Sequence, residues 1–310
     1  MKTTPLPYRR QSRHTGWIAA SLMTLMMTSI WGGIWPGMTT AALAQTGVQT
    51  GEQTGAQTGA QTLRVEADQQ LEWRRDDQQY IARGNAVLTT PEMTLKADTI
   101  TADYTNSPEP TNSDAQNSKN RITSIIATGE ADITYLDAQG LETHGQAKTI
   151  HYDRQADILT LSGLPAAGVI RVTREGNITE ARDSITYHRA TGIITNIGNT
   201  ATKFTDGRQI FGDKAVTTTS PDDGKIVQIT ITGNARILHP DANGNIQEAT
   251  GDHAVYDAAS DTVTVTGHVI LTEAENILKG SKAVMKIGEG TSVLSSDGDN
   301  NRVSGQFVLE

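Results

Sequence analysis

The chain has 310 residues with 26 basic and 35 acidic side chains and no cysteine, which gives a formal net charge of -9. The absence of cysteine excludes a disulfide framework and a zinc site built from thiolates, and from the acidic charge we expect no nucleic-acid partner. Phenylalanine occurs only three times, so isoleucine, valine, alanine and threonine are expected to form the interior.

The first 44 residues have the three-part pattern of a secretory signal peptide. A basic start is followed by a mostly apolar stretch over 17–35, by Pro36 and by the small-residue segment Ala42-Leu43-Ala44. This order predicts export to the periplasm and cleavage near Ala44. The alternative is a retained membrane anchor, because residues 17–35 approach the length of a membrane span. Threonines, a serine and glycines interrupt that run and favour cleavage.

Two further segments are predicted to lack regular structure. Residues 45–62 repeat glycine, threonine and glutamine, which predicts a flexible spacer. Residues 107–120, SPEPTNSDAQNSKN, are polar and rich in turn-forming residues, which predicts a disordered insert. No linker interrupts the rest of the chain, so we expect a single folded domain over 63–310.

A glycine-centred strand recurs seven times through this domain. Most of the recurrences follow a step of 34 to 38 residues, and the one longer step contains the predicted insert. A fixed period of this size indicates one supersecondary unit that must stack on its neighbours to cover its apolar face. The glycines are Gly84, Gly129, Gly163, Gly198, Gly233, Gly267 and Gly305.

Apolar and polar residues alternate around each glycine. Residues two and four positions away are nearly all apolar and the odd positions are mostly polar, so one face of each strand is predicted to point inward. The fourth copy has Asn196 and Thr200 at inward positions, and its register is the least well specified. A second strand follows each glycine strand, with Asp-Gly or Asn-Gly turns between many of them. The pattern predicts an all-β fold of repeated antiparallel hairpins.

Segments at both ends of the domain match a known repeat. The domain opens with LRVEADQQLEW and YIARGNAVLTTPEMTLKADTITADY and ends with DNNRVSGQFVL. These segments resemble the OstA-like repeat of the LptA family of periplasmic lipopolysaccharide transport proteins, and the resemblance recurs through the whole domain. The matching residues are Val65, Glu66, Ala67, Asp68, Tyr80, Gly84, Asn85, Ala86, Leu95, Ala97, Asp98 and Ile100.

The resemblance implies an elongated, partly open β-jellyroll that carries lipopolysaccharide between membranes. Its lipid A acyl chains would be shielded in an apolar groove, and its partners would be LptC-like inner-membrane and LptD-like outer-membrane components with OstA-like domains. The terminal strands over 63–67 and 302–309 contain no proline, which favours head-to-tail self-association. The alternative is that the spacer or Glu310 shields these edges.

We expect the lipid to contact inward-facing residues. Taken alone, inward aliphatic residues at a period of two are more typical of an ordinary core, and only the family resemblance favours a groove. The candidate lipid-binding residues are Ile125, Ala127, Ile133, Leu161, Ile231, Ile237, Val265 and Leu271.

No motif predicts an enzyme. The sequence has no nucleophile elbow and no phosphate loop, and we expect no cofactor and no metal. Four aspartates recur near the second strands, Asp98, Asp183, Asp213 and Asp252, and are interpreted as exposed strand ends. Two alternatives remain, a structural scaffold of the same pathway without lipid carriage and a β-helix enzyme acting on polysaccharide.

Overall fold

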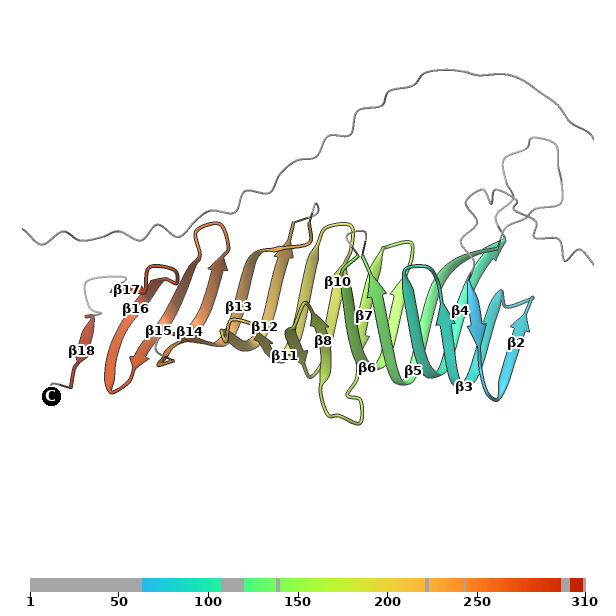
Figure 1. Cartoon of the computed structure of the whole chain (residues 1–310), viewed down its shortest axis with the longest axis horizontal. Coiled ribbons are helices and arrows are strands. Elements are labelled where there is room, and N and C mark those ends of the chain that lie inside the picture. Colours follow the sequence, from blue (N-terminus) through green and yellow to red (C-terminus); the bar gives the residue numbers. More distant parts are fainter. Residues whose placement is uncertain are drawn as a thin grey trace, which may run out of the picture. The chain divides into compact units, whose positions relative to one another are not determined.

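The described part of the chain is an antiparallel β-structure without helices (Figure 1). All of its residues belong to one compact unit over 57–310, and no helix in that part is long and apolar enough to cross a membrane. The prediction of an all-β fold built from antiparallel hairpins is confirmed. The computed structural model describes residues 63–106, 120–137, 140–220, 223–241, 244–296 and 302–308.

Three sequence predictions concern residues outside this set. The signal peptide over 1–44 and the spacer over 45–62 lie wholly outside the described residues, as does nearly all of the insert over 107–120. The boundaries at Ala44 and Leu63 therefore stay predictions.

Strands β2 to β7 and β10 to β17 each pair with the next strand along the chain. Between these two series the long strands are replaced by pairs of short ones. Strands β7 and β8 both pair with β6, and strands β9 and β10 both pair with β11. The strands are β1 Arg64–Glu66, β2 Gln70–Arg74, β3 Gln79–Thr89, β4 Met93–Asn106, β5 Asn120–Leu136, β6 Glu142–Asp153, β7 Ile158–Ser162, β8 Ile170–Arg174, β9 Asn177–Ala181, β10 Ser184–His188, β11 Ile193–Lys203, β12 Gln209–Thr219, β13 Ile226–Pro240, β14 Ile246–Asp257, β15 Thr262–Glu273, β16 Asn276–Lys286, β17 Thr291–Ser295 and β18 Ser304–Gln306.

The repeat glycines mark irregular points in the strands, most of them β-bulges. In the first copy two residues, Gly84 and Asn85, lie opposite the single residue Asp98. The backbone φ is positive at the first six repeat glycines, and in five copies it is also positive at the following residue. Glycine adopts this conformation without the strain that a Cβ would cause, which explains its recurrence. Gly305 has no such backbone and lies in the short strand β18, so the seventh copy is not a bulge.

The recurrent aspartates contact the repeat glycines. The interpretation as exposed strand ends holds for Asp183, which directly precedes β10, but is wrong for Asp98, Asp213 and Asp252, which lie within strands. Asp98 and Asp213 are exposed but lie in mid-strand, and a Cβ added to Gly129 or Gly233 would collide with their carboxylates. The amide of Asn234, the residue after the glycine, donates a 2.8 Å hydrogen bond to Asp213. The same packing joins Asp183 to Gly198 and Asp252 to Gly267.

The strands bend at the bulges, so that the sheet folds over on itself. Thr143 and Tyr152 are nine residues apart along β6, which is about 30 Å in a straight strand. Arg189 nevertheless donates hydrogen bonds of 2.8 Å to Tyr135, the partner of Thr143, and of 3.3 Å to Tyr152. The two halves of the strands must therefore face each other. We call the strand halves that end next to residues 75–78, 154–157, 189–192 and 258–261 the first layer. The second layer consists of the halves that end next to residues 90–92 and 205–208 or at Leu136 and Glu142.

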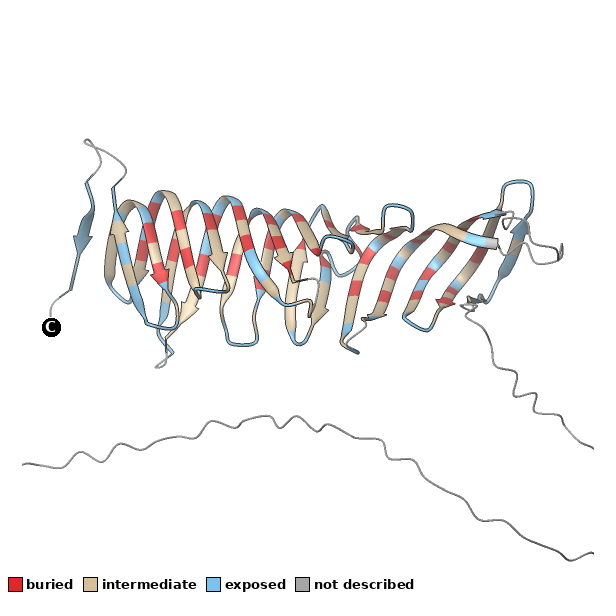
Figure 2. Cartoon of the chain, turned by 90° about the horizontal axis from the view of Figure 1, so that it is seen from above, coloured by how far each residue is buried: buried red, intermediate tan, exposed pale blue. Residues whose placement is uncertain are grey.

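The interior between the layers contains two apolar clusters. The first extends from Ala82 to Ile185 and the second from Ile210 to Met285 (Figure 2). Both include most of the apolar positions expected around the repeat glycines, together with residues of the strands that pair with them. Strand β11 separates them with polar inward residues, because Asn196 and Thr200 are buried as the repeat register requires. The interior is thus divided by a polar joint at β11.

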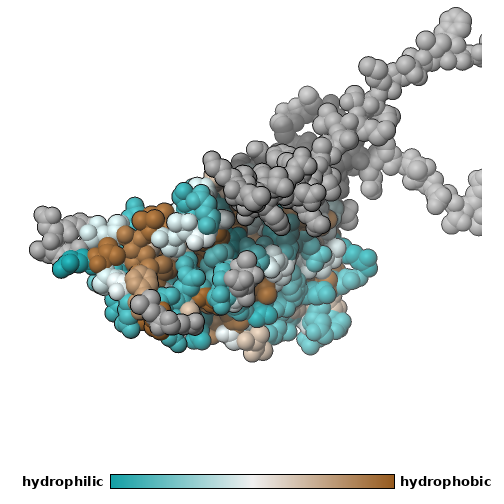
Figure 3. Space-filling view, turned by 60° about the vertical axis from the view of Figure 1, so that its left-hand side comes forward, coloured by the Kyte–Doolittle hydropathy of each residue, from teal (hydrophilic) through white to brown (hydrophobic). Residues whose placement is uncertain are grey.

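Each end of the described sheet is formed by two short strands. In this part of the chain β1 and β2 pair only with β3, and β17 and β18 pair only with β16. Leu71 and Trp73 on β2 are exposed, as are Val293 on β17 and Phe307 after β18. Figure 3 shows apolar side chains gathered at the end of the sheet that carries β17 and β18. Among the described strands, both edges therefore present backbone without a further strand partner, together with apolar surface.

Candidate ligand-binding cavity

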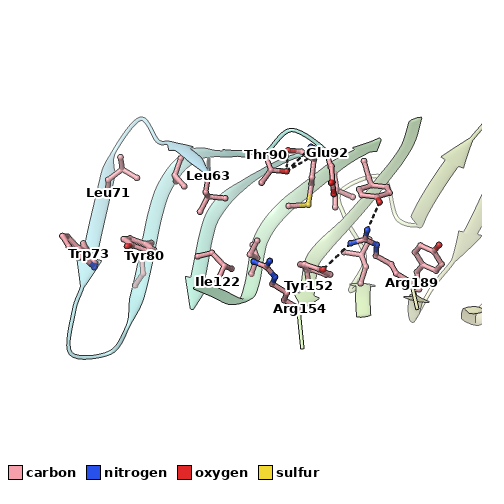
Figure 4. Close-up of a pocket in the computed structure, with 18 of the residues that line it drawn as sticks. Leu63, Leu71, Trp73, Tyr80, Thr90, Glu92, Ile122, Tyr152, Arg154 and Arg189 are labelled. Carbon is pink, nitrogen blue, oxygen red and sulfur yellow. Dashed lines mark hydrogen bonds between the residues drawn. The ribbon is translucent and has the colours of Figure 1, made fainter. Parts of the chain in front are cut away.

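A cavity of about 750 Å³ lies between the two layers at the β1–β10 end of the sheet (Figure 4). The first layer contributes residues of β2, β3, β5, β6, β7 and β10. The second layer contributes residues of β1, Met93 at the start of β4 and Tyr135 near the end of β5. A volume of this size lies within the range typical of small-molecule sites. Its lining is mainly aliphatic and aromatic and includes Leu63, Val65, Leu71, Trp73, Tyr80, Ile122, Ile125, Ile133 and Leu159.

Three aromatic side chains form a stacked wall at the β2 end of the cavity. The rings of Trp73 and Tyr80 are 5.9 Å apart, and those of Tyr80 and Tyr104 are 4.7 Å apart. The indole nitrogen of Trp73 donates a 2.8 Å hydrogen bond to the hydroxyl of Tyr104. The stack fixes flat apolar surface beside the opening, although Trp73 itself remains half exposed.

At the opposite end Arg189 joins the two layers. Its guanidinium lies 3.4 Å from Asp157 and hydrogen bonds to Tyr135 of the second layer and Tyr152 of the first (Figure 4). Burial raises the pKa of both tyrosine hydroxyls. We call Arg189, Asp157, Tyr135 and Tyr152 the Arg189 clasp, and three of these residues, Arg189, Tyr135 and Tyr152, line the cavity.

The second half of the sheet contains a matching arrangement around Arg208. Its guanidinium lies 3.4 Å from Asp261 and packs on the rings of Phe204 and Tyr256. Tyr256 donates to Asp261 at 3.2 Å, as Tyr152 donates to Asp157 at 3.0 Å. We call this the Arg208 clasp, and it shows that the joining of the two layers is itself a repeated feature.

Charged residues of opposite sign lie on the two sides of the opening. Arg154 comes from the first-layer turn after β6, and Glu92 comes from the second-layer turn before β4. Neither forms an ion pair within the described part of the chain. Glu72 also lines the cavity, but Arg74 and Arg83 contact its carboxylate at 2.6 and 2.9 Å, and their hydrogen bonds lower its pKa.

The structure places the candidate lipid-binding residues in two groups. Ile125 and Ile133 line the cavity. Ala127 and Leu161 belong to the same apolar cluster but do not line the cavity. The remaining four are buried in the second cluster, away from the cavity: Ile231, Ile237, Val265 and Leu271.

Sequence reasoning missed the aromatic and charged residues of the site. Trp73, Tyr135 and Arg189 lie at strand ends or in turns, where a period of two carries no information on contacts. One signal was present, because YDRQAD and YDAASD place Tyr152 and Tyr256 five residues before an aspartate. That spacing marks the hairpin turns on which both clasps are built.

The described residues that line the cavity include no metal-binding cluster. Within the described ranges no group of three or more histidine, aspartate or glutamate side chains could hold a metal ion. The pKa values of Glu72 and Arg189 are shifted by their contacts with neighbouring side chains, the ion pairs of Glu72 and the clasp contacts of Arg189. The arrangement can shelter an apolar chain and present charge at its opening.

The chain matches one protein-family model, described as LptA/(LptD N-terminal domain) LPS transport protein, over residues 64–193 and 201–291. Among solved structures it is similar to LptH from Pseudomonas aeruginosa, described as the LptA-homologous periplasmic component of the lipopolysaccharide transport device. That alignment has 21% identity and a TM-score of 0.32 and covers 41% of this chain and 76% of LptH. No curated protein sequence matches.

Proposed function

The chain belongs to the LptA/(LptD N-terminal domain) family of LPS transport proteins, and on that premise we propose that it carries lipopolysaccharide across the periplasm with acyl chains sheltered in the cavity between its layers. As a member of a transport family it is not an enzyme. The single observation that carries the proposal is an apolar cavity between the two layers. An ordinary repeat core would fill this space with side chains.

The physical reason for such a cavity is the cost of exposing acyl chains to water. Each buried CH₂ is worth about 0.8 kcal/mol, so a chain of about a dozen carbons resists crossing an aqueous compartment by roughly 10 kcal/mol. A cavity of about 750 Å³ shelters part of a lipid with several chains. The remainder is expected to lie along the opening, against Leu71 and Trp73, which are exposed.

Filling the cavity tests this proposal. Leu159 lines the cavity and is only partly buried at the margin of the first apolar cluster, so Leu159→Trp should fill cavity volume without replacing a fully buried core residue. We expect co-purification of lipopolysaccharide with the exported protein to fall at least several-fold. Val227→Trp, at an exposed position on β13, is the matched control and should retain the wild-type amount. Equal lipid content in both variants would refute carriage in this cavity.

The edge strands support a proposal about partners. Unpaired backbone groups on β1, β2, β17 and β18 can extend the sheet into another OstA-like domain. We propose that one edge meets an LptC-like inner-membrane component and the other an LptD-like outer-membrane component, and that copies also associate head to tail. Such contacts would align successive cavities into a bridge.

A scaffold role without lipid carriage is favoured by one observation. Ile231, Ile237 and Val265 are almost completely buried in the second cluster, so this half has the packing of an ordinary core. If Leu159→Trp leaves the lipid content unchanged while envelope assembly still requires the protein, the scaffold role accounts for the result.

A further inference from the structure

We infer that the opening of the cavity contains an anion-binding subsite centred on Arg154, which takes the phosphate of an amphiphile whose tail lies in the cavity. The inference rests on the proposed function and adds to it the orientation and the charge of the ligand. Nothing in the acyl-chain argument requires a charged group at this place, so the subsite can be tested separately.

The first observation is that Arg154 is a cation without a partner beside an apolar cavity. It lines the cavity from the first-layer turn over 154–157, and its exposed side chain forms no ion pair or hydrogen bond within the described residues. The neighbouring carboxylates are already in use. Asp157 is held by Tyr152 and Arg189, and Asp153 accepts hydrogen bonds from two backbone amides of the turn.

The second observation is the asymmetry of the opening. Glu92 lines the cavity from the second layer and is likewise without an ion pair in the described ranges. An anionic group that enters with an apolar tail is attracted to the Arg154 side and repelled from the Glu92 side. The two charges therefore orient the ligand, and a neutral head group gains nothing from either.

The third observation is that Arg189, the other arginine that lines the cavity, already has partners. Arg189 already contacts Tyr135, Tyr152 and Asp157, and an anion bound to it would have to open the clasp. Arg154 can instead form a charge-assisted hydrogen bond with a phosphate oxygen without breaking a contact. The phosphate is therefore expected beside Arg154 and not in the Arg189 clasp.

The fluorescence of Trp73 offers a direct readout. The chain has four tryptophans. Trp73 lines the cavity, and the other three lie outside the described residues. In full-length protein with Trp17→Phe, Trp31→Phe and Trp35→Phe, emission comes from Trp73 alone. Dodecyl phosphate and dodecyl maltoside, titrated below their micelle concentrations, share one tail and differ in charge. Both should shift the emission to shorter wavelength, because Trp73 is half exposed in the free protein.

We expect dodecyl phosphate to bind about tenfold more tightly than dodecyl maltoside, which corresponds to about 1.4 kcal/mol. Arg154→Gln should abolish that preference and leave maltoside binding unchanged, whereas Arg154→Lys should retain part of it. Glu92→Gln should strengthen dodecyl phosphate binding. The control Arg182→Gln removes an exposed arginine that does not line the cavity and should change nothing.

The outcomes separate the subsite from the proposed function. Equal binding of both amphiphiles, unaffected by Arg154→Gln, overturns the subsite and leaves lipid carriage standing. If neither amphiphile shifts the emission, both ideas fail. Inorganic phosphate at the same concentration should neither shift the emission nor displace dodecyl phosphate. Displacement by phosphate alone would assign the site to a free anion and would overturn the inference.

Discussion

At the scale of single residues, four copies of the repeat share a glycine and an aspartate that meet across neighbouring strands. The glycine supplies a positive φ, and the space over its Cα is filled by the aspartate, as with Gly233 and Asp213. Two independent requirements thus select glycine at one position, the backbone conformation and the absence of a Cβ. Together they explain why this residue recurs when its neighbours vary.

Substitution by alanine separates the two requirements. Gly244→Ala, in a turn with a positive φ and open space around it, should lower the free energy of unfolding by about 1 kcal/mol through backbone strain alone. Gly233→Ala should cost about 1 to 3 kcal/mol more, because the new methyl group meets the Asp213 carboxylate. Urea unfolding followed by circular dichroism measures both, and equal losses would contradict the role given to Asp213.

Single residues also show what the sequence can and cannot predict. Inward positions such as Ile125 and Val265 are buried as expected, and even Asn196 obeys the register, because alternation depends only on local backbone geometry. Whether an inward residue borders a cavity depends on how far apart the layers lie. That distance is set by turns and long-range contacts such as Arg189 with Tyr135, which a period of two does not encode.

At the scale of strands, ion pairs join the short strands to the continuous sheet near the polar joint. Glu180 on β9 accepts hydrogen bonds from Arg171 on β8 at 2.7 Å and from Lys203 on β11 at 3.3 Å. Burial alone would raise the pKa of Glu180, but the hydrogen bonds of these two cations prevail and lower it. The triad therefore connects three strands across the second layer.

The lowered pKa of Glu180 predicts a dependence of stability on pH. A carboxylate whose pKa is depressed in the folded state stabilises the protein above its unfolded value of about 4.3, and this contribution is lost as the pH falls through the folded value. Glu180→Gln should thus reduce stability at pH 7, by about 1 kcal/mol, and flatten the loss between pH 5 and 3. Urea unfolding midpoints at pH 7, 5 and 3 measure this effect, and Glu142→Gln at an exposed position is the control. If the midpoints of the wild-type protein and of Glu180→Gln change in parallel with pH, the triad does not contribute to stability.

The two clasps predict local rather than global effects at the strand ends. Arg189→Gln should speed hydrogen exchange at the amides around Tyr135 and Tyr152, because the bonds that join the layers there are lost. Arg208→Gln should do the same around Phe204 and Tyr256. Each variant controls for the other, and an unchanged exchange pattern at both pairs would show that the clasps do not hold the layers together.

At the scale of the whole molecule, the polar joint at β11 divides the interior of one continuous sheet into two apolar parts, which we call the first and the second interior. The family model matches the chain in two stretches, 64–193 and 201–291, and the gap between them falls within β11. The cavity lies in the first interior, while the inward residues of the second are closely buried. This division supports the proposal that the ligand binds in the first interior.

Association through the edges is expected to depend on β17. Val293→Lys places a charge on an exposed edge strand, which opposes pairing with another chain. Sedimentation velocity should show concentration-dependent oligomers for the wild-type protein and fewer for this variant. Val227→Lys, on β13 within the sheet, is the matched control, and equal association of both variants would remove β17 from the interface.

The most direct test of lipid carriage is site-specific photo-crosslinking to lipopolysaccharide in cells. A photoreactive residue at Ile133, which lines the cavity, should form a lipid adduct, whereas one at Ile237, buried in the second interior, should form none. A third probe at exposed Val227 reports contact with lipid at the outer surface. An adduct at Ile133 alone is the predicted result, and its absence there, or equal adducts at all three positions, would contradict a sheltered acyl chain between the layers.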